Sequence, residues 1–193
     1  MAVESSFTVP DAVSFAEAIA LTQALLDGLE QGKVTAATLE TTIAALVCSE
    51  NGARGFFVTY LSDDRALADQ PMPTVVAALQ TSSAIVSPLL VKNLAMSTAM
   101  AMTHRRNQDE TMAEGSERVR SRTLQLIQVL QLPQVQVEAQ QLLQAIEMST
   151  GSYQTFLERW GYDLEQRQAM QQTLEAAGIV APASGLDAAS EVG

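Results

Sequence analysis

Apolar residues recur at steps of three and four along most of this chain, and this spacing strongly constrains its fold. Such a spacing places apolar side chains on one face of an α-helix. Ser14 and Glu17 open the first run with the S-x-x-E spacing of a capping box, which satisfies two backbone amides at a helix start. Gly32 supplies the residue that is favoured just past a helix end. The helical face consists of Phe15, Ile19, Thr22, Leu26 and Leu29.

The same criteria predict a series of helices over the rest of the chain, joined by short connections. Capping residues, glycines and prolines mark where each helix starts and ends. Asn51-Gly52, for example, is expected to end the second helix. Beyond the first helix, the predicted helices cover residues 35–50, 53–61, 74–86, 89–106, 116–131, 134–149, 153–160 and 163–178.

Residues 53–61 fit both a strand and a helix. The run from Phe56 to Tyr60 has strand propensity, whereas the pairs Phe56/Tyr60 and Phe57/Leu61 have the i,i+4 spacing of a helix. A helix is favoured because a lone strand would find no partner elsewhere in the chain. Pro88 interrupts a later apolar run, and we expect it either to kink the helix or to restart it.

The last predicted helix carries signals at both ends. Asp163 and Gln166 have the spacing of a second capping box. Gly178 is the expected left-handed residue just past the helix, followed by an apolar residue, Ile179. This order is typical of a Schellman motif, in which Ile179 contacts Leu174 of the last turn.

Composition and length agree with an assembly of helices. Aromatic residues make up only 5% of the chain, whereas alanine and glutamine are abundant. A chain of 193 residues suits one domain. We therefore expect an all-α, single-domain bundle of seven to nine helices with short loops over residues 12–179. A flexible leader is expected over 1–11, and a disordered, flexible C-terminal tail over 180–193.

The charge balance excludes several classes of partner. Eleven basic residues against 22 acidic ones give a net charge of −11, which repels nucleic acid and anionic lipid. The most apolar window, residues 84–103, contains Lys92 near its middle, so we expect a buried core helix and no stable membrane insertion. The single cysteine, Cys48, forms no internal disulfide, and the N-terminus has no secretory pattern. A cytoplasmic location is expected.

The sequence lacks the common motifs of enzymes and metal sites. One histidine and one cysteine are too few for a di-iron or a structural zinc site. Phosphate-loop, dinucleotide-binding and hydrolase-elbow motifs do not occur. We therefore expect no catalytic residues, no metal and no cofactor, and a non-enzymatic protein is favoured.

A basic island interrupts the acidic chain. Residues 104–122 contain His104-Arg105-Arg106 and, further on, Arg118, Arg120 and Arg122. Arginine donates paired hydrogen bonds to carboxylate or phosphate, so the island could hold an anion. The alternative is ordinary pairing along one helix, since Glu114/Arg118 and Glu117/Arg120 have the i,i+4 and i,i+3 spacings of weak ion pairs.

Two functions fit these features. The first is a helical protein–protein interaction or assembly module that associates with a protein partner or with itself, for instance as a homodimer. It rests on the missing catalytic motifs and on the Ala/Met-rich segment 93–102. The alternative is a small-ligand-binding protein, with or without enzymatic activity. The residues expected to hold its anionic ligand are His104, Arg105, Arg106, Arg118 and Arg122.

Overall fold

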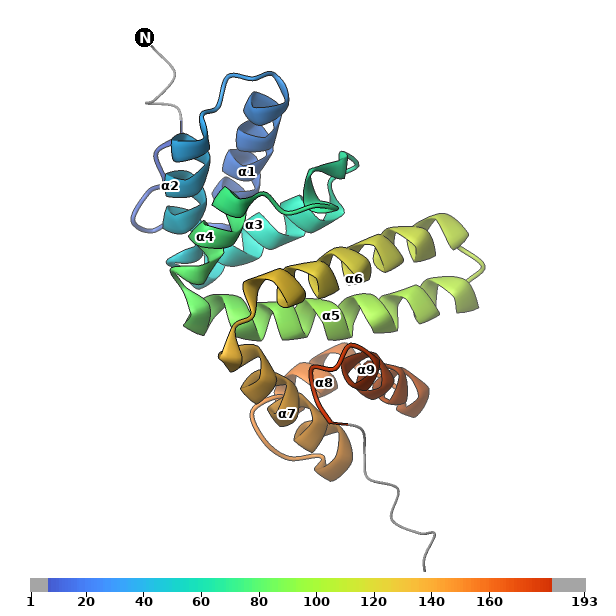
Figure 1. Cartoon of the computed structure of the whole chain (residues 1–193). Coiled ribbons are helices and arrows are strands. Elements are labelled where there is room, and N and C mark those ends of the chain that lie inside the picture. Colours follow the sequence, from blue (N-terminus) through green and yellow to red (C-terminus); the bar gives the residue numbers. More distant parts are fainter. Residues whose placement is uncertain (1–6, 182–193) are drawn as a thin grey trace, which may run out of the picture.

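Two long antiparallel helices, α5 (Ser83–Arg106) and α6 (Glu110–Leu130), cross the middle of the molecule and organise the rest (Figure 1). The computed structural model describes residues 7–181, in which every regular element is a helix. The predicted all-α bundle of seven to nine helices is confirmed. One side of the central pair carries α1 (Phe15–Glu30), α2 (Ala36–Val47), α3 (Glu50–Ser62) and α4 (Pro73–Gln80). The other side carries α7 (Pro133–Met148), α8 (Gln154–Trp160) and α9 (Leu164–Ala176).

Both predicted capping boxes are present. The Ser14 amide donates to the Glu17 carboxylate at 2.9 Å, and the Glu17 amide donates to the Ser14 hydroxyl at 3.2 Å. Asp163 and Gln166 repeat this exchange at the start of α9. The Schellman motif is also confirmed, because the Ile179 amide donates to the Leu174 carbonyl at 3.1 Å.

The boundary between the second and third helices was predicted wrongly. The chain leaves the helix at Cys48 and Ser49, and residues 51 and 52 already belong to the first turn of α3. The Ser49 hydroxyl accepts a hydrogen bond from the Gly52 amide at 3.1 Å. A Cβ atom on Gly52 would lie 2.0 Å from the Leu46 carbonyl oxygen. The absence of a side chain at Gly52 therefore lets α3 start in close contact with the end of α2. Gly52 does not end a helix.

Two further boundaries differ from expectation. The break before the central helix falls at Thr81 and Ser82, and Pro88 lies inside α5 without ending it. Ser82 adopts the non-helical backbone that separates α4 from α5, whereas Pro88 lies within α5 and removes one of its backbone donors. The next helix, α6, begins at Glu110 and not at 116, because the Asp109 carboxylate accepts from the Met112 amide at 3.1 Å.

The ambiguous residues 53–61 are helical, as predicted, and form the centre of the N-terminal side. Phe56 and Phe57 of α3 are fully buried. Gly55 brings α3 close to α1, since a Cβ atom there would lie 2.5 Å from the Ala18 methyl group. Glycine at this position therefore lets α1 and α3 pack in close contact.

Helix α5 is the core helix expected over 84–103. Leu90, Leu94 and Ala99 are all buried, and α5 packs against both sides of the molecule. Among the described residues, α5 is the one helix that is long and apolar enough to cross a membrane, yet most of that stretch is buried inside the protein. Small residues along it allow the neighbouring helices to approach closely.

The ends of the predicted domain lie partly outside the described residues. Of the expected leader 1–11, residues 1–6 fall outside them, while Phe7 and Val9 pack against the core. Of the expected tail 180–193, residues 182–193 fall outside them, while Val180 is buried.

Candidate functional site

The predicted basic island is divided among several places in the structure. His104, Arg105 and Arg106 occupy the last turn of α5, where basic residues favour the negative pole of the helix. Arg118 and Arg122 lie on the antiparallel helix α6. Each of the four arginines meets a different set of acidic or carbonyl groups, so the predicted ligand residues do not converge on one centre.

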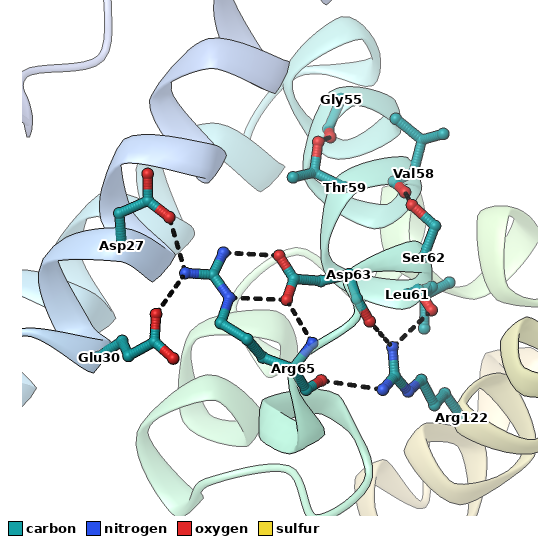
Figure 2. A network of polar contacts seen from close by, with 10 residues as sticks. All are labelled: Asp27, Glu30, Gly55, Val58, Thr59, Leu61, Ser62, Asp63, Arg65 and Arg122. Atoms are coloured by element: carbon teal, nitrogen blue, oxygen red, sulfur yellow. Dashed lines mark hydrogen bonds and ion pairs between the residues drawn. The ribbon is translucent and has the colours of Figure 1, made fainter.

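Arg122 is the most buried of these residues, with 2% of its surface exposed. Its guanidinium donates to the backbone carbonyls of Leu61, Asp63 and Arg65 at 3.0, 2.6 and 2.9 Å. Its Nε donates to the Asp69 carboxylate at 2.6 Å. Figure 2 shows how the side chain reaches from α6 to the end of α3. These contacts fix the connection between α3 and α4, including the short 3-10 turn η2 (Ala66–Ala68), against α6.

Arg65 extends this network to α1 (Figure 2). It donates to both oxygens of Asp63, at 2.7 and 2.6 Å, and to Asp27 at 2.7 Å. Glu30 lies 3.3 Å from the same guanidinium. The hydrogen bonds from Arg65 hold the pKa of the Asp63 carboxyl below its ordinary value. Arg65 was not predicted as a key residue, although the Asp63-x-Arg65 spacing was a local signal for the pair.

Arg106 and Arg118 each bridge to a distant segment. Arg106 pairs with Asp163 and Glu165 and so ties the end of α5 to the start of α9. Its hydrogen bond lowers the pKa of the Asp163 carboxyl. Arg118 lies 3.1 Å from Asp64 in the α3–α4 connection and does not use the expected Glu114 pairing.

Arg105 contributes to a groove between α5, α6 and α9. Its guanidinium lies 3.0 Å from one carboxylate oxygen of Glu117, and Arg120 contacts the other oxygen. The expected Glu117/Arg120 pair is therefore confirmed. The groove has a volume of about 500 Å³. Its lining combines these three charged residues with small or apolar ones, among them Ala101, Met102, Leu124, Ala169, Thr173 and Ala176.

Gln166 holds one wall of this groove in place and was recognised from the sequence only as a capping residue. Its side-chain amide donates to the Ala99 carbonyl at 3.1 Å and to the Thr103 hydroxyl at 2.9 Å. Since Gln166 is buried, these bonds fix the position of α9 on α5. Their partners are more than sixty residues away in the chain, so no local pattern could reveal them.

A second polar cluster lies between α5, α7 and the start of α8. The Lys92 ammonium group lies 5.6 Å from the centre of the Tyr153 ring, and the Tyr153 hydroxyl donates to Glu138 at 2.9 Å. Burial, together with the neighbouring Glu138, raises the pKa of Tyr153. The cluster satisfies polar atoms that would otherwise be buried without partners, which indicates a packing role. Among residues 7–181, no group of His, Cys, Asp and Glu side chains could hold a metal.

The corner between α8 and α9 presents two large apolar side chains to solvent. Trp160, the only tryptophan of the chain, is 51% exposed, and Leu164 is 72% exposed. A tight turn separates them, with Gly161 in the left-handed conformation and Tyr162 buried. The spacing of Trp160 puts it on the same helix face as Tyr153 and Leu157, which are buried, yet the folded chain leaves Trp160 exposed.

Comparison with known proteins identifies a family. No curated protein and no solved structure matches the chain significantly. The model of a family described as "Uncharacterised conserved protein UCP020893" matches residues 14–177. These limits coincide with the N-cap residue of α1 and the C-cap residue of α9, so the match spans all nine α-helices of the described residues. The chain belongs to this family.

Proposed function

We propose that this protein is a non-enzymatic helical interaction module that associates with a second copy of itself through the α8–α9 corner. The observation that carries the proposal is the exposure of Trp160 and Leu164 on either side of one tight turn. Tryptophan is enriched at the energetic centres of protein interfaces, and neighbouring exposed apolar side chains mark interaction surfaces.

The charges around this corner support association with a second copy. The chain as a whole carries −11, so most of its surface repels another copy. Close to Trp160 and Leu164 in the chain, however, Arg159, Asp163 and Glu165 are exposed, and the two carboxylates pair with Arg106 of α5. A surface with both signs of charge around an apolar centre is complementary to itself in a two-fold arrangement.

The test is the oligomeric state of the intact chain, measured by native mass spectrometry and analytical ultracentrifugation. We expect the wild type to form a species of twice the 20.7 kDa chain mass, with a dissociation constant below about 100 µM. The double variant W160A/L164A should remain monomeric. V58A removes another exposed apolar side chain, from α3 across the central pair, and should dimerise like the wild type. A monomeric wild type, or a dimeric W160A/L164A, contradicts the proposal.

The proposal also concerns location and partners. It places the protein in the cytoplasm, without a nucleic acid partner and without membrane insertion. The net charge of −11 argues against a nucleic acid partner, and the burial of most of α5 inside the protein argues against membrane insertion.

Binding of an anionic small ligand is the second candidate function, and one observation favours it. Of the predicted ligand residues, Arg105 lines the groove between α5, α6 and α9, where Arg120 joins it. His104, Arg106, Arg118 and Arg122 are not among the groove residues. This candidate therefore rests on Arg105 and Arg120, of which only Arg105 was among the five expected residues.

A further inference from the structure

Arg159, at the α8–α9 corner, is an arginine whose side chain finds no partner within its own chain. Six of the nine arginines pair with a carboxylate. Arg54 lies over an aromatic ring, and Arg167 donates to a backbone carbonyl. Over residues 7–181, the Arg159 side chain has no such contact, although acidic residues outnumber basic ones two to one in the chain. It is exposed in the last turn of α8, directly before Trp160.

On the other side of the turn, one carboxylate oxygen has no hydrogen-bond donor. Asp163 uses both of its oxygens, since Oδ1 accepts from the Gln166 amide and Oδ2 accepts from Arg106. Glu165 meets Arg106 through Oε2 alone. In the described part of the chain, Oε1 of Glu165 has no donor, and this side chain is 71% exposed. Since a carboxylate has acceptor sites on both oxygens, Glu165 can accept a second arginine from another molecule.

Two-fold symmetry limits how two copies of this corner can meet. An axis that passes through Trp160 brings Arg159 towards the same arginine of the other copy, and an axis through Leu164 brings the two copies of Glu165 together. Like charges that face each other across an interface disfavour both arrangements. An axis between Trp160 and Leu164 places each tryptophan against the leucine of the other copy. Arg159 then lies towards Glu165 of the other copy, so opposite charges meet twice.

We propose that Arg159 of each copy donates to Oε1 of Glu165 in the other copy, so that two identical ion pairs flank a centre of Trp160 against Leu164. This inference rests on the proposed self-association through the α8–α9 corner and adds the contact that sets the relative orientation of the two copies. Charged pairs beside an apolar centre also give specificity, because another exposed apolar surface would leave Arg159 without a carboxylate.

The test is charge reversal followed by mixing of the two variants. The R159E homodimer would have two acidic residues at each contact, and the E165R homodimer would have two basic ones. We expect each variant alone to have a dissociation constant at least about tenfold higher than that of the wild type in analytical ultracentrifugation. A mixture of R159E and E165R restores opposite charges at both contacts. Native mass spectrometry should therefore show the heterodimer in large excess over either homodimer.

A matched variant separates the proposed pair from a general effect of net charge. R54E has the same net charge as R159E, but it changes an exposed arginine of α3, across the central pair from the corner. Arg54 also has no carboxylate partner among the described residues. R54E should dimerise like the wild type. If R54E and R159E lose dimer equally, the cause is repulsion between whole molecules, and the proposed pair is overturned.

A further variant keeps the proposal testable if E165R fails to fold, since this substitution also places a positive charge beside Arg106. R159E/E165Q removes the repulsion between acidic residues without adding a positive charge. It should recover part of the dimer that R159E loses, in protein whose circular dichroism shows the helical fold. If R159E/E165Q dimerises no better than R159E, the two residues do not face each other and the proposal is wrong.

Failure of this inference is distinguishable from failure of self-association itself. A monomeric wild type would contradict association through the corner and with it the ion pairs. A wild type that dimerises, a monomeric W160A/L164A and an R159E variant with an unchanged dissociation constant would together keep the corner as the interface. That combination would overturn only the pairing of Arg159 with Glu165.

Discussion

Arg122 is the residue on which the polar contacts of the N-terminal side depend most. Replacing it with alanine removes the donor to the buried hydrogen bond at Leu61, to two partly buried carbonyls and to Asp69. We expect R122A to lower the free energy of unfolding by about 3 kcal/mol or more. The matched control is R118A on the same helix, whose exposed pair with Asp64 contributes less than about 0.5 kcal/mol. Urea denaturation of both variants measures the difference, and equal losses would contradict this account.

Asp63 makes the contribution of this network to the stability of the folded protein depend on pH. Its pKa is lowered in the folded protein by hydrogen bonds from Arg65, so its ionised form is stabilised relative to the unfolded chain. This stabilisation is present above the unfolded pKa, which is about 3.9, and is lost as the pH falls through the lower folded value. The thermal midpoint of the wild type should therefore fall more steeply below about pH 4 than that of D63N. If the thermal midpoints of the wild type and of D63N change in parallel with pH, the Asp63–Arg65 pair does not contribute this pH-dependent stability.

Residue contacts were predictable from the sequence only where the partners are close in the chain. Glu117/Arg120 was expected from its spacing and is present. Arg106, Arg118 and Arg122 find acidic partners on other elements, more than fifty residues away. Helical spacing carries no information on such distant partners. The basic residues of 104–122 therefore resemble one site in the sequence, whereas they belong to several separate sites in the structure.

At the scale of the helices, the close contact between α1 and α3 depends on a glycine, Gly55, which has no side chain. A methyl group at Gly55 would lie 2.5 Å from the Ala18 methyl group, so G55A should force the two helices apart and cost about 1–3 kcal/mol. Gly115 in α6 provides the control, because a Cβ atom there meets nothing within 4 Å. G115A should stabilise the protein by about 0.5–1 kcal/mol through the better helix propensity of alanine. Thermal and urea unfolding should show that G55A is less stable than the wild type and that G115A is more stable.

Helix ends were predictable where the signal is a local hydrogen bond. The boxes at Ser14 and Asp163 and the motif at Gly178 depend on residues a few positions apart, and all three are present. The boundary at Ser82 has no side-chain cap, whereas the conspicuous Pro88 lies within a helix. Helix α5 packs against both sides of the molecule, and these contacts cannot be read from residues 80–90.

For the molecule as a whole, α5 joins the two groups of helices, since it packs against α3, α4 and α6 as well as α7 and α9. Such a shared core helix should make residues 7–181 unfold as one cooperative unit. The single tryptophan, Trp160, lies in the C-terminal group, so its fluorescence reports on that group, while circular dichroism reports on all helices.

This arrangement allows the cooperativity to be tested with a substitution far from the probe. R122A weakens the connection between α3 and α4, across the central pair from Trp160. If the molecule unfolds as one unit, R122A should shift the fluorescence and dichroism midpoints in urea to the same lower concentration. L94A opens a cavity in the core around α5 and should lower the free energy of unfolding by about 2–5 kcal/mol. It should shift the fluorescence and dichroism midpoints whether or not the molecule unfolds as one unit, and it serves as the positive control. A fluorescence midpoint that stays at its wild-type value in R122A, while the dichroism transition becomes biphasic, would show that the two groups of helices unfold independently.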